Sequence, residues 1–180
     1  MVLAHPYEKN GGKWKMILQT KYFGEIDVRE DRVVHFQNGI PGFEEVKKYI
    51  LIDNEEEGSP FKWLQGIEGV KPAFVIIDPF AVKKDYEVNL SNEIMKEMDI
   101  KEAGEVAVYC IVVVPDDISK MTMNLQAPLI INTAKMAGRQ LILDTDRYGV
   151  RHYILEELQG REESGNARTD KEKGPVHNNK

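Results

Sequence analysis

Short strand-like segments separated by turn residues are the feature that most constrains how this chain can fold. Glycine, proline and asparagine punctuate the gaps, as at Asn38-Gly39 and Pro41-Gly42. Regular spacing of short strands predicts a mostly β fold, either a single compressed β-barrel or a two-sheet domain. The expected strands lie at 16–23, 32–36, 49–53, 61–64, 73–78, 106–114, 121–126, 129–131, 140–144 and 151–155.

Helical signals are few. Ser91 can cap a short helix from Asn92 to Met98, which would place Ile94 and Met95 on the same face as Met98. The segment 44–48 is long enough for one helical turn. The run 106–114 has no polar alternation, so we expect a strand buried on both faces. The sequence therefore predicts a β domain with a few short helices.

The segment 121–132 combines an alternating pattern with a proline. Apolar and polar residues alternate up to Gln126, which predicts a strand with one apolar and one polar face. Pro128 should end or bulge this strand before the apolar run that Asn132 closes. A core hairpin or a kinked edge strand explains the pattern. Alternatively, the amides of Asn124, Gln126 and Asn132 bind the backbone of a partner.

Charge is unevenly distributed along the 180 residues. The formal net charge is −6, but residues 1–15 carry +2 and residues 159–180 carry +1, so the body between them holds −9. Binding to a phosphate backbone requires cations that replace the counterions of the nucleic acid. The acidic body therefore argues against a nucleic-acid partner and suits a basic protein partner.

The two ends are expected to differ from the body. Residues 1–15 form a flexible extension without the apolar region of a signal peptide, and residues 159–180 form a disordered polar tail. No run reaches the ~18 apolar residues of a membrane helix. Cys110 is the only cysteine, which excludes an intramolecular disulfide and suggests a buried, inert thiol. We expect one cytoplasmic domain, monomeric when free.

Catalytic motifs are absent from the sequence. The four histidines are scattered, and no zinc-protease, serine-hydrolase or phosphate-loop spacing occurs. Asp144-Thr145-Asp146 begins like a calcium loop, but Tyr148 and Leu155 occupy positions where ligands belong. We expect no catalytic residue, cofactor or metal site. A small-molecule enzyme or a nucleic-acid-binding module with a β-barrel fold is the alternative class.

Two further features could contact a protein. The loop after Asp53 carries Glu55, Glu56 and Glu57, which are either solvated or attract a basic partner electrostatically. Phe80 follows Asp78-Pro79 and is expected in an exposed loop, where it could anchor a partner helix. Core packing is the expected role of Trp63 and Phe74, and also of Met121, Met123 and Met136, for which contact with a partner is the alternative.

Several motifs resemble the flagellar assembly factor FliW family. MTMNLQAPLIIN at 121–132 is similar to a characteristic stretch of that family. The further similar motifs follow in the same order along the chain, and the resemblance covers roughly residues 16–158. These motifs are TKYFGEIDV at 20–28, FQNGIPGFEEVKKYILI at 36–52, FKWLQ at 61–65, AFVIIDP at 73–79 and RYGVRHYI at 147–154.

The resemblance implies a partner-binding function. Proteins of this family bind the flagellin subunit before export, through its carboxy-terminal helical region. They also bind the translational regulator CsrA and prevent it from repressing flagellin translation. The two partners bind in alternation, so export of flagellin would release the factor to relieve repression. The resemblance assigns neither partner to particular residues.

Overall fold

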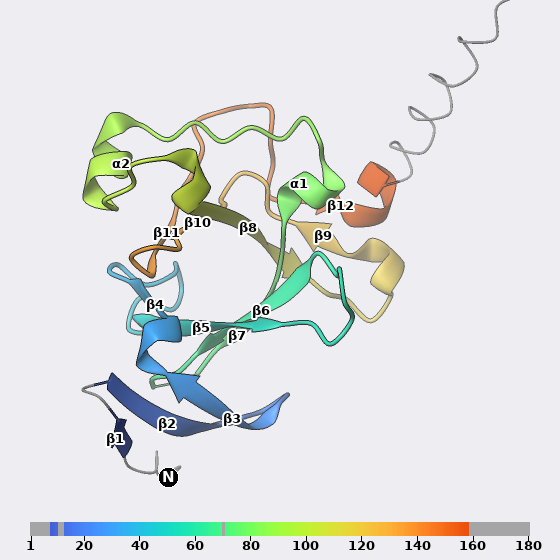
Figure 1. Cartoon of the computed structure of the whole chain (residues 1–180). Helices are drawn as coiled ribbons and strands as arrows, with labels where there is room; N and C mark the ends of the chain where they lie inside the picture. The colour runs from blue at the N-terminus through green and yellow to red at the C-terminus, as the bar shows by residue number, and fades with distance from the viewer. Residues whose placement is uncertain (1–7, 11–12, 70, 159–180) are drawn as a thin grey trace, which may run out of the picture.

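The structure, a computed structural model, describes residues 8–10, 13–69 and 71–158 and is mostly β (Figure 1). One sheet has the strand order β1-β2-β3, and a nine-stranded sheet has the order β10-β11-β4-β5-β6-β7-β8-β9-β12. The strands are β1 (Glu8–Asn10), β2 (Lys13–Thr20), β3 (Gly24–Arg29), β4 (Val33–Phe36), β5 (Lys48–Asp53), β6 (Phe61–Gly66), β7 (Ala73–Ile77), β8 (Val106–Val113), β9 (Thr122–Met123), β10 (Leu129–Asn132), β11 (Ala137–Gln140) and β12 (His152–Tyr153).

A second pairing of β10 closes the large sheet into a barrel. β10 pairs with β11 on one side and with β8 on the other, where Leu129 lies opposite Tyr109. Seven strands, β4 to β8 with β10 and β11, therefore form a closed ring, which confirms the barrel rather than the two-sheet arrangement. The end of β8 runs beyond the ring and pairs with β9, which pairs with β12.

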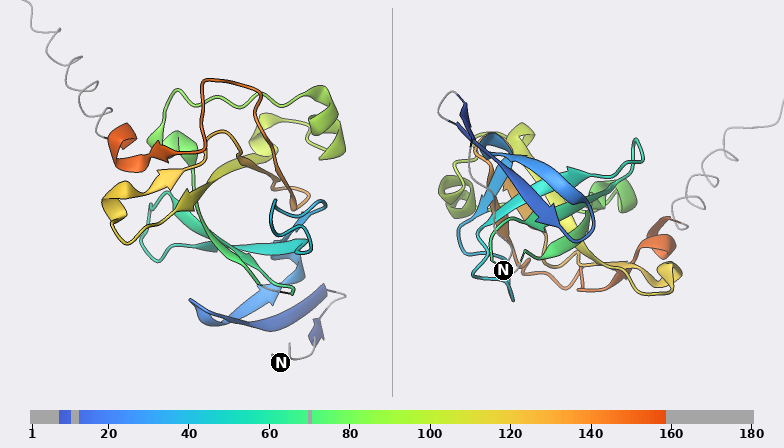
Figure 2. Two further views of the ribbon diagram at one scale, coloured as in Figure 1. Left: turned by 180° about the vertical axis from the view of Figure 1, so that it is seen from behind. Right: turned by 90° about the horizontal axis from the view of Figure 1, so that it is seen from below.

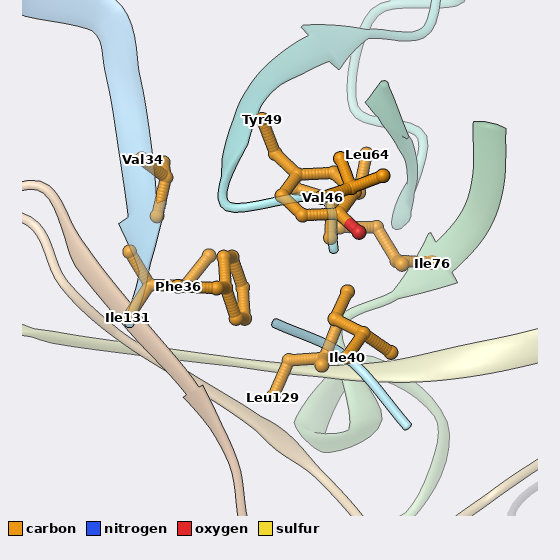
Figure 3. Packing of buried hydrophobic residues seen from close by; sticks show 9 residues of the cluster. All are labelled: Val34, Phe36, Ile40, Val46, Tyr49, Leu64, Ile76, Leu129 and Ile131. Atoms are coloured by element: carbon orange, nitrogen blue, oxygen red, sulfur yellow. The ribbon is translucent and has the colours of Figure 1, made fainter. Parts of the chain in front are cut away.

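The barrel interior is filled by apolar side chains from every side (Figure 3). Phe36 and Tyr49 are fully buried and meet edge to face, with ring centroids 5.2 Å apart. The Tyr49 hydroxyl has no hydrogen-bond partner among the described residues, and burial raises its pKa to about 12. The Tyr49 side chain therefore stabilises the fold through the apolar area that it removes from water, and not through a hydrogen bond of its hydroxyl.

The sheet β1-β2-β3 covers part of the outer barrel surface. Leu18 and Val28 from this sheet pack against Val33 and Ile50 of the barrel. Trp63 lies on the same outer side of β6, where it contacts the rings of Tyr22 and Phe23. Trp63 and Phe74 are only half-buried, although both pack against neighbouring aromatic rings.

The helices are short, as predicted. They are α1 (Pro79–Val82), α2 (Asn92–Glu97), the 3-10 turns η1 (Glu30–Arg32), η2 (Ala103–Glu105) and η3 (Ile118–Lys120), and a helical stretch at 154–158. Ser91 caps α2, because its Oγ accepts a hydrogen bond from the Ile94 N–H at 3.3 Å. The segment 44–48 is a turn that leads into β5, not a helix.

Some strand boundaries differ from the prediction. β3 is absent from the predicted strands, because its sequence begins with glycine and contains three charged residues. Val28 is the one residue of β3 that is buried. β11 occupies 137–140 rather than 140–144, because the tight turn at Met136, with φ of 52°, sets its register against β10. Only Thr122–Met123 of the segment 121–126 is strand. The prediction that the strand at 106–114 is buried on both faces was wrong. Val113 is 62% exposed where β8 leaves the barrel.

Strands occupy part of the segment 1–15 that was predicted to be a flexible extension, since β1 lies within it. β2 begins at Lys13, so a strand already occupies part of the segment assigned to the amino-terminal extension. Residues 1–7 and the predicted polar tail at 159–180 lie outside the described residues. None of the helices in the described part of the chain is long and apolar enough to cross a membrane.

Candidate functional site

A long excursion between β7 and β8 creates the main surface groove. Residues 78–105 leave the barrel, form α1 and α2, and lie against the outer surface of β8 and β10 (Figures 1 and 2). They leave a groove of about 370 Å³ whose lining contains no ionisable side chain. The lining residues are Phe80, Val88, Asn89, Leu90, Met95, Ile100, Ala103, Val106, Val108 and Ile130.

The groove has a rigid floor and a partly exposed rim. Alternate residues of β8 face outward, which brings Val106 and Val108 next to the buried Ile130 of β10. Met95 is half-buried, and Phe80 on α1 is 44% exposed. The Asp78 carboxylate caps α1 by accepting a hydrogen bond from the Phe80 N–H at 2.9 Å, which fixes the start of that helix. Phe80 is exposed, as predicted, but it lies on α1 rather than in a loop.

Tyrosine and arginine side chains hold one side of the excursion on the barrel. The buried Tyr86 hydroxyl donates to the Leu125 carbonyl at 2.7 Å, and the Tyr148 hydroxyl accepts from the Glu87 N–H at 2.9 Å. Arg147 bonds the carboxylates of Asp85 and Glu87, each at 3.0 Å. The hydrogen bond from Arg147 lowers the pKa of Asp85. Two motifs far apart in sequence, 121–132 and 147–154, thus position the same loop.

Asn132 holds the other side of the excursion. This fully buried residue donates from Nδ2 to the carbonyls of Met98 and Asp99, at 2.9 and 3.1 Å. Its Oδ1 accepts from the N–H groups of Ala134 and Lys135, at 3.0 and 3.1 Å. Asp99 has φ of 50°, so the amide fixes the strained turn that follows α2. Asn132 thus fixes the turn that leads to Ile100, which lines the groove.

Asn124 and Gln126 lie at the start of the β9-to-β10 connection and are half-buried. The Asn124 Oδ1 accepts from the Ala127 N–H at 3.0 Å, which stabilises the turn before Pro128. The backbone of Gln126 bonds Gly149 and Leu143, at 3.2 and 2.8 Å. Neither residue lines the groove, and Gln126 helps to bind the loop 141–151 to the barrel.

The acidic cluster lies on a different element. Glu55, Glu56 and Glu57 are exposed in the loop between β5 and β6, and none of them lines the groove. Asp53 at the end of β5 pairs with Lys62 across the hairpin, and this hydrogen bond raises the pKa of Lys62. The three glutamates add three exposed negative charges to this loop.

A second, smaller hollow of about 210 Å³ lies where β4 and β11 separate. Its charged groups are already engaged: Glu97 pairs with Arg139, and Glu44 accepts from the Gly42 N–H at 2.8 Å.

The buried Cys110 lies outside both hollows, and burial raises the pKa of its thiol to about 12. In the described ranges, no three His, Cys, Asp or Glu side chains are grouped so that they could hold a metal ion.

Most of the groove could not be identified from the sequence. Its residues come from α1, α2, the loop between them, the connection from α2 to β8 and two strands, so no local spacing connects them. Phe80 was the one groove residue among the predicted contacts. The signal available for the others was the predicted helix at 92–98, whose apolar face includes Met95.

Comparison with known proteins gives a consistent result. A family model described as FliW protein matches residues 16–154. A flagellar assembly factor FliW from Ruminiclostridium cellulolyticum is 48% identical over 147 residues, covering 82% of this chain and 99% of the relative. Its counterpart from Alkaliphilus metalliredigens is 46% identical, covering 84% and 93%. A solved structure titled "Crystal structure of the flagellar assembly factor FliW" matches with a TM-score of 0.70 and 36% identity, covering 77% of this chain and 96% of that one.

Proposed function

The chain belongs to the FliW family of flagellar assembly factors, and we propose that it binds flagellin in the cytoplasm and antagonises the translational regulator CsrA. In this proposal, flagellin's carboxy-terminal helical region docks into the groove between the excursion 78–105 and the barrel. Bound flagellin keeps the factor away from the regulator. Export of flagellin frees the factor, which then relieves repression of flagellin translation.

The groove is the observation that carries the flagellin half of the proposal. An amphipathic helix presents an apolar stripe with anchors at i, i+3, i+4 and i+7. The groove offers a matching apolar surface on a rigid floor, with the Phe80 ring at its rim. Because its lining carries no ionisable side chain, a helix can bury its apolar face there without desolvating a protein charge.

The charge of the body supports the regulator half. A protein that binds RNA needs cationic groups on its surface. The body of this chain carries −9, and three glutamates project from the β5–β6 loop. Opposite charges accelerate encounter more than they increase affinity. The same excess negative charge opposes direct binding of this protein to the flagellin transcript.

Substitution of Phe80 tests the proposal. We expect Phe80→Ala to weaken flagellin binding about 5- to 30-fold, which corresponds to the ~1–2 kcal/mol of an exposed aromatic anchor. Calorimetry with purified flagellin measures the change. Tyr22→Ala is the matched control, since Tyr22 is an exposed aromatic residue on the β2–β3 turn, outside the groove. Unchanged affinity in Phe80→Ala, with the fold intact, would exclude the groove, and no binding by the parent protein would exclude flagellin as a partner.

A further inference from the structure

Exposed apolar side chains are concentrated where β8 leaves the barrel. Of the eleven large apolar residues that are exposed in the described part of the chain, six lie at or directly after the end of β8, on η3, on β12 or on the helical stretch after it. Four of them form what we call the barrel-end patch: Val113, Val114, Ile118 and Tyr153. Soluble monomers rarely expose contiguous apolar surface unless it contacts a partner.

The strand register places two residues of this patch, Val113 and Tyr153, on one sheet face, on either side of the buried Thr122. Val113 lies opposite Thr122 of β9, and Thr122 lies opposite Tyr153 of β12, so the three side chains share a face. The other face of the same strands is covered, because Val112 and Met123 are buried in the core beneath the excursion. Ile118 lies on η3, in the turn between β8 and β9, and is 67% exposed.

Negative charge lies beside the patch. Asp116 and Asp117 are exposed in the turn that follows Val114, and the ion pair of Asp117 with Lys120, at 3.1 Å, leaves this turn with a net charge of −1. The loop between β5 and β6, which carries Glu55 to Glu57, projects from the same end of the barrel as this turn (Figures 1 and 2). An occupant must therefore combine an apolar anchor with a basic surround.

We propose that the barrel-end patch docks a basic segment of a protein partner through an apolar anchor. The inference rests on the proposed function, under which the RNA-binding regulator is the partner with this chemistry. The chain's own residues 159–180 do not fit, because Ala167 and Val176 are their only aliphatic residues besides one proline. A second copy does not fit either, because it would bring the same carboxylates face to face.

This assignment separates the two partners in space. None of the patch residues lines the groove, yet both surfaces include β8: Val106 and Val108 form part of the groove floor, and Val113 lies at the strand's far end. A partner at one surface can affect the other only through this strand and the elements packed on it, or through the bulk of the partners themselves. The regulator and the flagellin helix therefore contact different residues.

Two sets of variants test the proposal by measuring association and dissociation rates with the purified regulator. We expect the double variant Val113→Ser, Ile118→Ser to weaken binding at least tenfold, mostly through faster dissociation, because the anchor is lost. We expect the triple variant Glu55→Gln, Glu56→Gln, Glu57→Gln to slow association and to reduce its salt dependence. Ile142→Ser is the control, since Ile142 is 78% exposed outside the patch.

The outcomes distinguish this inference from the function on which it rests. If the parent protein binds the regulator and the double variant binds equally well, the patch is not the docking surface, and the proposed function survives. If the parent protein does not bind the regulator, both fail. If sedimentation shows that the parent protein dimerises and the double variant does not, the patch joins two copies and the proposal is overturned. Retained flagellin binding in the double variant establishes that it is folded.

Discussion

At the scale of single residues, Asn132 is the position where sequence and structure assign different roles. The sequence leaves two roles open for Asn132, which either shapes a core hairpin or bonds the backbone of a partner. The structure buries it completely and uses both ends of its amide within the chain. Two of those partners, Met98 and Asp99, lie more than thirty positions away, and no local pattern reveals them.

We expect Asn132→Ala to lower the free energy of unfolding by about 1–3 kcal/mol, because two buried carbonyls and two N–H groups lose their partner. Flagellin affinity should fall as well, since the turn after α2 would loosen. Urea denaturation measures the stability. Asn54→Ala is the control on an exposed loop and should change stability by no more than about 0.5 kcal/mol. Equal stability of the two variants would contradict the role given to Asn132.

Phe80 and Cys110 show what sequence reasoning can identify. Phe80 follows a proline that starts a short helix, and its exposure was predicted from that local context. The burial of Cys110 was predicted from the apolar run around it, and its raised pKa keeps the thiol protonated at neutral pH. Both predictions depend on neighbours in sequence. Val88, Leu90 and Ile130 become one groove only after the chain has folded.

At the scale of elements, the barrel depends on one close contact between β11 and β4. These strands form the parallel pair of the ring, with Gly138 opposite Phe36. A Cβ atom added at Gly138 would lie 2.5 Å from the Phe36 ring, which is fully buried and has no room to move. The glycine is therefore required for close approach rather than for an unusual backbone conformation.

Gly138→Ala should lower the free energy of unfolding by about 1–3 kcal/mol, because the methyl group overpacks the core against Phe36. Thermal and urea denaturation measure the change. Gly104→Ala is the matched control, since a Cβ there meets no atom within 4 Å. If both glycine variants are equally stable, β11 and β4 do not pack as described.

Element positions were predicted better than their pairing. All ten expected strands overlap an observed strand, although 140–144 overlaps β11 at Gln140 alone, since apolar alternation and turn residues are local signals. The misplaced β11 and the omitted β3 carry few apolar residues, and tertiary pairing alone makes them strands. The closing pair β8–β10 joins segments about twenty residues apart, and the sequence left barrel and two-sheet arrangements equally open.

At the scale of the whole molecule, the barrel serves as a rigid scaffold for two chemically different surfaces. One is the apolar groove beneath α1 and α2, and the other is the acidic, partly apolar barrel end. The acidic body was evident from the sequence, whereas the division into two surfaces was not. Because both surfaces share β8, the account predicts that occupation of one weakens binding at the other.

Calorimetry of the two partners tests this claim most directly. Flagellin is titrated into the free protein and into its regulator complex, and the regulator is titrated into the free protein and into its flagellin complex. Linkage requires that each partner weaken the other by the same factor. We predict such a reciprocal weakening, of at least about fivefold, the lower limit of a typical coupling energy. Flagellin and regulator affinities that do not change when the other partner is bound would contradict the account.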